Sequence, residues 1–568
     1  MTAAEQDTGD RAGGGGPLHR RRFLKAASGT ALTAAAVGAA PAPTRTPVQA
    51  PPPAPTSAPT RTMTPTRARA VIPQIGDTMP SLAFDDPTTQ QRLGRLYASA
   101  LTDMTDRNTI AADPAVYDRA GLLTDPPGTL VRAGAGYPTP QRWTRDAAVN
   151  AWSAASLLAP DVGRNTLWSV VDRGPGGLVV QQDNQWWDQV VWIVAARHHH
   201  LVTDDGDFLA KAYETSVHTM REREKHSFDA AYGLFRGPGF MNDGISGYPE
   251  PPSAPEVRSS FVLDHPHAAD LMCLSTNCLY YGARTALAAM ADALGRPEEA
   301  EAWRTSAGRL RAAVDRQLWR PEAGTYAYLV HGSGPFAGRV DTSQEGAGLA
   351  LAVLLGVADE RRARQLLAGA HWQPHGIVNV WPHFARFGAS RPGRHNVMVW
   401  PMVHGLYGLA AAMAGRTEEF ARAVETFADL VTGSGGDFYE VYDSVSGKVD
   451  GGWQSGASGR PEHFVSQPHQ TWSATAYLRL IHEGMVGLVH SADTVRLRPC
   501  LPRHWGPVRL HGLRWRDLTL DITLSGAGNR VRSCTVDGRP GAPVLSAAGR
   551  GRHTVELVLE GLEGLDGE

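Results

Sequence analysis

Residues 279–319 read LYYGARTALAAMADALGRPEEAEAWRTSAGRLRAAVDRQLW, and this stretch has the clearest helical pattern in the sequence. Apolar residues recur at spacings of three and four on both sides of Gly295-Arg296-Pro297. That spacing predicts two amphipathic helices. The glycine and proline between them predict a tight turn, so the two helices form an αα-hairpin.

The same periodicity continues through most of the chain, and successive helices pair in sequence order. We therefore predict a mainly α protein, an (α/α)6 barrel or six-hairpin toroid over residues 73–486, whose loops at one end build a site. The predicted helices are 89–106, 143–158, 186–202, 206–224, 267–294, 296–318, 343–356, 359–369, 396–415, 417–432 and 470–486.

After residue 487 apolar and polar residues alternate with a period of two. Stretches such as VRLHGLRWRDLTLDITLSG (508–526) and HTVELVLEG (553–561) predict strands. We expect residues 487–562 to form a small antiparallel β-sandwich module. Cys500 and Cys534 both lie in it, and their spacing leaves open whether they form a disulfide.

The N-terminal sequence predicts an export signal. Residues 19–25 read HRRRFLK and precede an Ala-rich stretch, a pattern typical of a twin-arginine export signal over residues 1–40. The pair is Arg20 and Arg21; the alternative is a disordered basic tail. Residues 41–72 are Pro/Thr-rich and predict an extended, disordered linker. We expect a protein secreted by the twin-arginine machinery, with no integral membrane segment once the signal is removed.

Composition excludes several classes of function. The 568 residues have a net charge of −2, which argues against binding nucleic acid or membranes through bulk charge. Four cysteines exclude a disulfide scaffold, and without a C-x-x-C pair no metal site is predicted. No cofactor is predicted either. The run His198-His199-His200 is interpreted as a solvated helix end, because three consecutive residues do not converge on one metal.

The predicted loops are rich in tryptophan, carboxylates and arginine. Aromatic faces stack on the C–H surfaces of sugars, and charged side chains hydrogen-bond their hydroxyl groups, so the loops predict a carbohydrate site. For the carboxylates a capping role stays open, as does a core role for Trp400. The candidate substrate-binding residues are Trp143, Arg145, Asp146, Trp187, Asp188, Gln344, Glu345, Trp381, Arg394, His395, Trp400, Trp453, Gln470 and Trp472.

Hydrolysis of a glycosidic bond needs two carboxyl groups. Asp243 lies in a glycine- and aromatic-rich loop, where a raised pKa would suit a general acid; the alternative is a turn with Gly244. Glu440 lies among aromatic and apolar neighbours in FYEVYD, and its alternative is an ion pair with an arginine.

Several motifs resemble the six-hairpin glycosidases. The similarity is greatest to the inverting group of processing α-glucosidases, trehalases and mannosylglycerate hydrolases, and the module after residue 487 is similar to the β domain of rhamnosidase-like members. The motifs are RWTRD (142–146), WWD (186–188), HNVMVWP (395–401), and FYEVYDSVSG (438–447) with HQTWSATAYL (469–478).

This resemblance implies roles for the two carboxylates. Glu440 falls where the family has its general base, and Asp243 where it has its general acid. The loop GFMNDGISGYP (239–249) departs from the usual Glu-Ser-Gly-aromatic-Asp, which weakens the acid assignment. The resulting expectation is an exo-acting, inverting hydrolase, in which the two carboxyl groups are roughly 6.5–9.5 Å apart.

Three other functions remain open on sequence. A glycoside phosphorylase would bind phosphate through Arg394 and His395. A polysaccharide lyase would take Tyr248, His265 and His395 as base and acid. A carbohydrate-binding protein would keep the barrel and lack catalysis.

Overall fold

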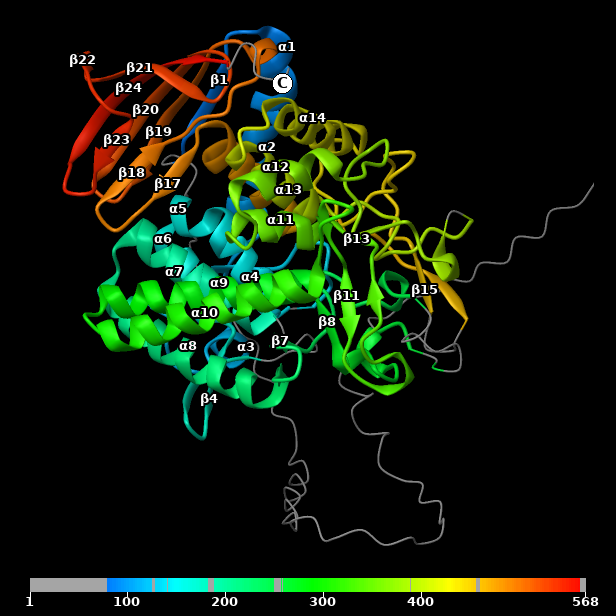
Figure 1. Ribbon diagram of the computed structural model, residues 1–568. Helices are drawn as coiled ribbons and strands as arrows, with labels where there is room; N and C mark the ends of the chain where they lie inside the picture. The colour runs from blue at the N-terminus through cyan, green and yellow to red at the C-terminus, as the bar shows by residue number, and fades with distance from the viewer. Residues whose placement is uncertain are drawn as a thin grey trace, which may run out of the picture. The chain divides into compact units, whose positions relative to one another are not determined.

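We analysed a computed structural model of the protein (Figure 1), which describes residues 79–561 apart from 125–127, 140, 182–187, 250–256, 258, 389 and 456–459. The chain divides into two units, Met1–Ala68 and Arg69–Glu568, and all the described residues belong to the second. The predicted export signal and linker lie outside the described residues, and so does Trp187.

The middle of the chain is helical, as predicted. In the hairpin around residues 295–297, Gly295 adopts a φ of 70° and Pro297 begins the second helix, which explains the sharp turn between the two helices. The principal helices are α2 (Arg95–Thr102), α4 (Thr144–Asn150), α6 (Pro160–Trp168), α7 (Asp188–Thr203), α8 (Gly206–Ser227), α9 (Leu274–Ala293), α10 (Pro297–Leu318), α11 (Gly346–Leu354), α12 (Glu360–Gly369), α13 (Pro401–Met413), α14 (Thr417–Gly433) and α15 (Thr471–Arg479).

The structure also has wider-pitched and short helical segments, most of which extend these helices. They are α1 (Pro87–Thr89), η3 (Gln90–Gly94), η4 (Asp103–Arg107), α3 (Pro114–Tyr117), η5 (Ala151–Ala155), α5 (Ser156–Leu158) and η11 (Leu480–Met485). The predicted helix over 143–158 is thus α4, η5 and α5 in succession, and the one over 470–486 is α15 and η11.

Three predicted helix starts were wrong, and the helices α3 and α6 were missed. The helix expected from 343 begins at Gly346, because residues 344–345 form strand β13. The helix expected from 267 begins at Leu274, because residues 271–273 form strand β8 and pair with β11. The helix expected from 396 begins at Pro401, since the residues before it form a turn. Helix α6 was not predicted, because PDVGRNTLW has few apolar residues and an interior glycine.

Six helices contact one another in a closed order: α4 with α7, α7 with α9, α9 with α11, α11 with α13, α13 with α15, and α15 with α4. Residues 346–353 of α11 are all buried, as expected for a helix that is apolar all round. Helices α6, α8, α10, α12 and α14 each contact one or more members of this closed series. In α14 the apolar residues form one face and the charged residues the other.

Short strands connect the helices. Leu271–Cys273 (β8), Leu329–His331 (β11) and Val340–Asp341 (β12) form one small sheet. The paired strands are β2–β3 (Thr109–Ala111, Thr129–Val131), β4–β5 (Val171–Gly174, Gly177–Val180), β6–β7 (Phe228–Asp229, Leu234–Phe235), β9–β10 (Trp319–Arg320, Thr325–Tyr326), β13–β14 (Gln344–Glu345, Val380–Trp381) and β15–β16 (Trp453–Ser455, Pro461–His463).

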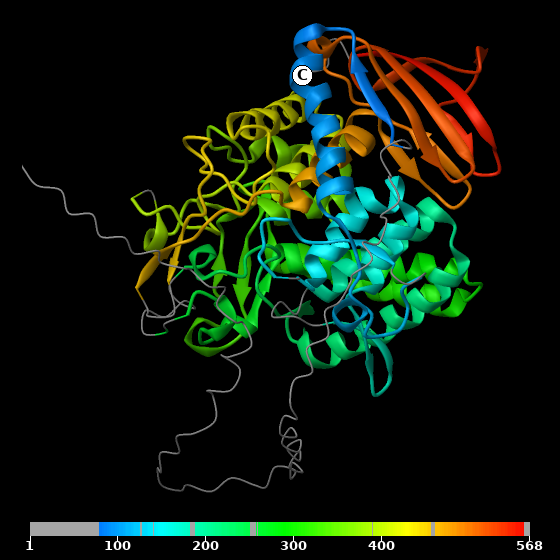
Figure 2. The same cartoon turned by 180° about the vertical axis from the view of Figure 1, so that it is seen from behind.

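The C-terminal region is built of strands, as predicted (Figure 2). One sheet has the order β1 (Ser81–Phe84), β19 (Val508–Trp515), β20 (Leu518–Gly526), β24 (Gly551–Glu560), β21 (Arg530–Val536), β22 (Arg539–Pro540). A second has the order β17 (Leu488–His490), β18 (Thr494–Leu497), β23 (Val544–Ser546).

The expectation of a purely antiparallel module was wrong in one place. Strands β20 and β24 are parallel, because β21, β22 and β23 lie between them in sequence and bring the chain back to the same end. Strand β1, from far upstream of residue 487, pairs with β19 at the sheet edge. Hydrophobic residues of both sheets share one core cluster with α2, α14 and α15.

The burial of two histidines shows that a further prediction was wrong. The run 198–200 is not a solvated helix end: His199 and His200 are buried, and His199 Nδ1 lies 3.0 Å from Ser156 Oγ. The cause is that α7 is enclosed by α5, α6 and α9. Cys500 and Cys534 are both free thiols.

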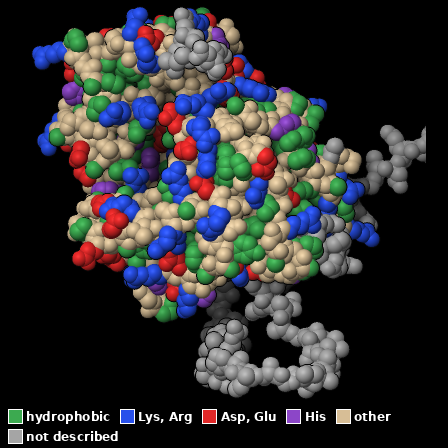
Figure 3. All heavy atoms as spheres, viewed as in Figure 1, with side chains coloured by type: hydrophobic (Ala, Val, Ile, Leu, Met, Phe, Trp, Pro, Cys, Tyr) green, Lys and Arg blue, Asp and Glu red, His purple; other side chains and the backbone are tan. Residues whose placement is uncertain are grey.

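The surface matches the balanced composition. Lys and Arg side chains alternate with Asp and Glu across the face in Figure 3, as the net charge of −2 suggests. Within the part of the chain that the structure describes, none of the helices has the length and apolar content needed to cross a membrane.

Candidate active site

The loop that carries Asp243 is fixed by buried hydrogen bonds. The Gly239 N–H donates to Tyr248 Oη at 2.9 Å, and the Tyr248 hydroxyl donates to the Asn242 carbonyl at 2.5 Å. The Asn242 side-chain amide and the Tyr328 hydroxyl share a hydrogen bond of 2.8 Å. All these side chains are fully buried, so the backbone on either side of Asp243 is rigidly held.

Asp243 faces an arginine and a histidine. Its Oδ1 lies 3.8 Å from Arg145 Nη1 and 3.7 Å from His395 Nε2. His395 Nδ1 lies 2.8 Å from the Met241 carbonyl, which can only accept, so Nδ1 carries the proton. Burial lowers the pKa of His395 to about 4, and the neutral ring therefore turns an acceptor nitrogen toward Asp243.

Glu440 is paired with the residue next to His395. Its Oε1 lies 2.6 Å from Arg394 Nη2, so the ion pair that the sequence left open is present. Arg394 also donates to the Gly451 carbonyl at 2.8 Å, and its guanidinium lies 4.9 Å from the Trp400 ring centroid. The Gln467 N–H points at Glu440 Oε2 from 3.4 Å. Glu440 and Asp243 thus face the consecutive residues Arg394 and His395.

Further predicted residues surround these two carboxylates. The Arg145 guanidinium lies over Trp472 at 5.3 Å, and Trp472 packs edge to face on Trp400 at 6.0 Å. Trp400 stacks in turn on His395 at 4.9 Å. Trp400 and Trp472 are almost completely buried, so they form the wall behind the site.

Two more carboxylates join the same wall. Arg145 Nη1 lies 4.0 Å from Asp188 Oδ2, which connects the beginnings of α4 and α7. The Gln470 side chain donates to Asp146 Oδ1 at 3.4 Å, which connects the beginnings of α15 and α4. The helices that meet in a closed order therefore bring the polar residues of their first turns to one end.

Glu345 lies behind the Asp243 loop and is fully buried. It accepts from the Ser275 N–H at 2.8 Å and from the Ser275 hydroxyl, at the beginning of α9. A side chain at Gly239 would collide with Glu345, so only glycine allows the loop to approach so closely. Burial raises the pKa of Glu345 to about 8, against the opposing hydrogen bonds from Ser275.

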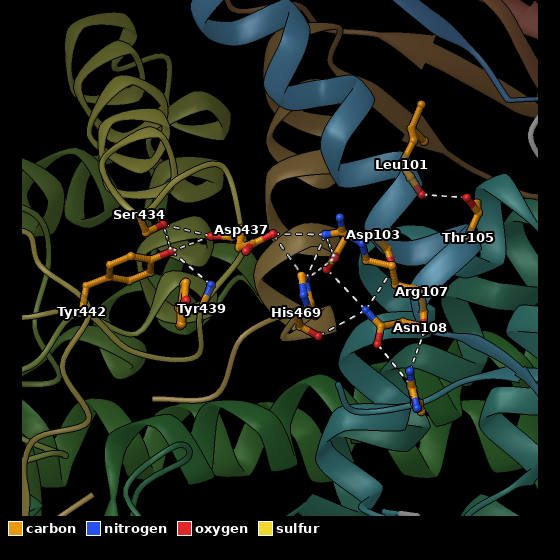
Figure 4. Close-up of polar contacts among 11 residues, drawn as sticks. Leu101, Asp103, Thr105, Arg107, Asn108, Ser434, Asp437, Tyr439, Tyr442 and His469 are labelled. Atoms are coloured by element: carbon orange, nitrogen blue, oxygen red, sulfur yellow. Dashed lines mark hydrogen bonds and ion pairs between the residues drawn. The ribbon is translucent and has the colours of Figure 1, made fainter. Parts of the chain in front are cut away.

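A cluster of charged residues holds the segment that precedes α15 (Figure 4). His469 Nδ1 lies 3.2 Å from Asp103 Oδ1 and 3.0 Å from Arg107 Nη1, and Arg107 reaches Asp437 at 3.2 Å. Burial raises the pKa of Asp103, and His469 and Arg107 oppose that shift. We name residues 103, 107, 437 and 469 the Asp103 cluster.

The Asp103 cluster supports the Glu440 segment through the backbone. The Gln470 N–H donates to the Phe438 carbonyl at 2.9 Å, and the Glu440 N–H donates to the Gln467 carbonyl at 2.9 Å. His469 lies between these two hydrogen bonds with a φ of 51°. The conformation that presents Glu440 therefore depends on the residues that hold His469.

The sequence matches the family described as mannosylglycerate hydrolase MGH1-like glycoside hydrolase domain over residues 139–473. The chain belongs to this family. The description of the family is that of a glycoside hydrolase domain. A search of the curated proteins found no match.

Solved structures share the fold at low sequence identity. A protein named sialidase matches with a TM-score of 0.59 and 15% identity, over 84% of this chain and 41% of its own. A GH78 family rhamnosidase of Bacillus sp. GL1 matches with a TM-score of 0.51 and 16% identity, over 79% and 42%. A GH63 mannosylglycerate hydrolase from Thermus thermophilus is 17% identical, with a TM-score of 0.47, over 68% and 100%. The chain thus spans less than half the length of the first two proteins.

The candidate active site does not bring together all the predicted residues. Gln344 and Trp381 pair across β13–β14 and line a separate cavity, where Trp381 stacks on His371 at 3.6 Å. Trp143 precedes α4 and packs on Tyr137 at 4.9 Å.

Trp453 touches the site through its backbone, because its carbonyl accepts from the Arg394 N–H at 3.1 Å. Its ring contacts His463 at 5.2 Å and the Arg391 guanidinium at 5.5 Å.

The sequence did not predict one buried residue of the candidate active site. Gln454 is buried, and a side chain at Gly244 would collide with it, so it lies against the residue that follows Asp243 in the loop. Among the described residues, Gln454 Oε1, Gln470 Oε1 and Trp472 Nε1 are buried without a hydrogen-bond partner. Polar atoms of this kind are usually satisfied by water or ligand hydroxyl groups. No signal in the sequence distinguished Gln454 from the other glutamines.

The side chains that could ligate a metal are dispersed. Across the described ranges, no group of three or more His, Cys, Asp and Glu side chains is arranged to hold a metal ion.

Proposed function

We propose that the protein is an exported, exo-acting glycoside hydrolase that cleaves an oligo- or polysaccharide with inversion, using Asp243 as general acid and Glu440 as general base. One observation carries the proposal: the two carboxylates face consecutive residues, because Glu440 Oε1 lies 2.6 Å from Arg394 Nη2 and Asp243 Oδ1 lies 3.7 Å from His395 Nε2. Family membership supports the reaction class.

The surroundings of Asp243 suit an acid. Its neighbour His395 is neutral and turns an acceptor nitrogen toward Asp243 from 3.7 Å, so the ring is compatible with a protonated Asp243 carboxyl. The glycosidic oxygen then takes that proton as the bond to the anomeric carbon breaks. His395 itself stays in place, because its other nitrogen is bound to the Met241 carbonyl.

The surroundings of Glu440 suit a base. Its partner Arg394 is held by the Gly451 carbonyl and by Trp400, which fixes the direction of the carboxylate. Glu440 removes a proton from water as the water oxygen bonds to the anomeric carbon. The sugar is released with the opposite anomeric configuration, Asp243 ends ionised and Glu440 ends protonated.

We propose that the helices form an (α/α)6 barrel. The closed order of contacts among α4, α7, α9, α11, α13 and α15 supports an inner ring, and α6, α8, α10, α12 and α14 then belong to an outer ring. The contacts between first turns support a funnel at one end of it.

The alternatives receive less support. Arg394 is already engaged by Glu440 and His395 is neutral, which leaves little positive charge for the phosphate of a phosphorylase. Tyr248, the lyase candidate, donates its hydroxyl to a carbonyl, and burial raises its pKa well above 10. A purely binding protein would not need two carboxylates at the same place.

Export is proposed on sequence alone. The arginine pair at 20–21, the apolar stretch and the Pro/Thr-rich linker support delivery across a membrane by the twin-arginine machinery. Secretion would bring the enzyme to polysaccharides outside the cell.

Sugar release by the purified protein tests the proposal. Oligo- and polysaccharides with α- and β-linkages are incubated with wild type, Asp243→Asn, Glu440→Gln and the exposed control Glu360→Gln. NMR spectra recorded during turnover identify the anomer formed first. We expect inverted product from wild type and control, and at least about a 100-fold loss in each site variant. Retained configuration, or an unimpaired Glu440→Gln variant, contradicts the mechanism.

A further inference from the structure

A cavity lies outside the candidate active site, since neither Asp243 nor Glu440 lines it. Its volume is about 610 Å³, within the range of small-ligand sites. It lies among the β9–β10 turn, β13–β14, the end of α12 and Arg422 of α14. Side chains with hydrogen-bonding groups or aromatic rings that line it include Thr342, Gln344, Gln365, His371, Trp372, Trp381 and Arg422.

Strand geometry separates this cavity from the candidate active site. Gln344 pairs with Trp381 across β13–β14, and Glu345 pairs with Val380. Successive side chains point to opposite faces of a strand. Gln344 and Trp381 therefore face the cavity, whereas Glu345 faces Ser275 behind the Asp243 loop.

The cavity wall is preformed. The Gln344 side chain accepts from the His371 N–H at 2.7 Å and donates to the His371 carbonyl at 3.2 Å. The His371 ring stacks on Trp381 with an interplanar angle of 5°. The Arg422 guanidinium lies 4.0 Å from the Trp372 ring centroid. Two tryptophans are thus fixed on one concave surface before any ligand binds.

We propose that this cavity binds a saccharide without cleaving it. Indole rings suit the C–H faces of a sugar, and the exposed side chains of Thr342, Gln365 and Arg422 suit its hydroxyl groups. The lining contains no Asp or Glu, so it lacks both carboxyl groups that hydrolysis needs. A phosphate ligand fits less well, because Arg422 is the one Lys or Arg in the lining.

The choice of a saccharide rests on the proposed function, because the ligand would be a distant part of the same substrate or its product. A bound glycan chain would keep the enzyme on a polymer between cleavages. The expected benefit is confined to long substrates, since a short one cannot occupy both places.

Binding is measured in the Glu440→Gln background, by native gels containing neutral polysaccharides in one arm and a polyuronate in the other. We expect Trp381→Ala and Gln365→Ala each to weaken retardation by about fivefold or more, the loss of one good contact. Arg361→Ala, exposed on the same helix but outside the cavity lining, is the matched control and should match the parent. The arm that retards the protein identifies a neutral or an acidic saccharide.

The variants also separate the two proposals. When Glu440 is not substituted, the Gln365→Ala variant should keep the wild-type kcat/KM on a short oligosaccharide. Its kcat/KM on the polymer should be several-fold lower than that of the wild type. Gln365 is exposed on α12, so alanine there leaves the fold intact even if Trp381→Ala does not. Unchanged retardation in Gln365→Ala, or no retardation by any glycan, overturns the cavity proposal. If the wild type hydrolyses no substrate but its retardation still depends on Gln365, the proposed function is wrong and the cavity proposal stands.

Discussion

Replacing Glu345 with glutamine tests how the Asp243 loop is supported. The Glu345 carboxyl is fully buried, receives two hydrogen bonds from Ser275 and has a pKa of about 8. At neutral pH it is therefore mostly protonated. Glutamine has nearly the same shape, and it stays uncharged at every pH.

The sign and size of the effect follow from the two pKa values. The unfolded carboxyl titrates near 4.5 and the folded one near 8. Between these values the native state keeps a proton that the unfolded state has lost, so the free energy of unfolding falls as pH rises. The slope approaches ~1.4 kcal/mol per pH unit, and the total reaches about 5 kcal/mol as an upper bound.

Urea unfolding followed by tryptophan fluorescence measures this at pH 5, 6, 7 and 8. We expect the free energy of unfolding of Glu345→Gln, minus that of wild type, to grow by about 1 kcal/mol per pH unit across this range. Subtraction removes the titrations that both proteins share. The exposed Glu360→Gln substitution should give a difference near zero throughout. A difference for Glu345→Gln that is independent of pH would refute a buried, protonated carboxyl.

Three other predictions concern different parts of the chain. Asp103→Asn should lower kcat roughly tenfold with little change in KM, because the cluster in Figure 4 positions Glu440; wild-type kcat with reduced stability would instead indicate a purely structural role. Burial lowers the pKa of His404 to about 4, so stability should fall as pH drops from about 6.5 toward 4; His404→Gln, compared with wild type in thermal unfolding at several pH values, should reduce that fall. Replacing Arg20 and Arg21 by lysines should keep the protein inside the producing cell, and fractionation followed by immunoblotting would contradict the signal if export continued.

The helices were predictable because each depends on its own sequence. The periodicity around Gly295 and Pro297 specifies α9 and α10 without reference to anything distant. The beginning of α9 was not predictable, because residues 271–273 look helical locally and become a strand only when β11 lies beside them. The prediction of strand direction was wrong for a similar reason. The local sequences of β20 and β24 do not indicate that the two strands are parallel.

In the candidate site too, features set by the local sequence could be predicted, and features set by distant contacts could not. The motif residues at helix starts or in the loops before them, such as Arg145 and Arg394, could be selected because charged and aromatic residues cluster there. Glu345 and Gln344 are neighbours in sequence, and the pleat sends them to opposite sides of β13. The role of Asp103 depends on contacts with residues more than 300 positions away, which one sequence does not reveal.

The pairing of β1 with β19 has a consequence for how the molecule can be made. The two strands are separated by roughly 400 residues, so the sheet edge closes only after nearly the whole polypeptide has left the ribosome. Until then β1 is an unprotected strand at the start of a nascent chain. A protein truncated before β19 would leave β1 without its neighbouring strand. The C-terminal strands therefore cannot be removed, or transferred to another helical toroid, as an independent domain.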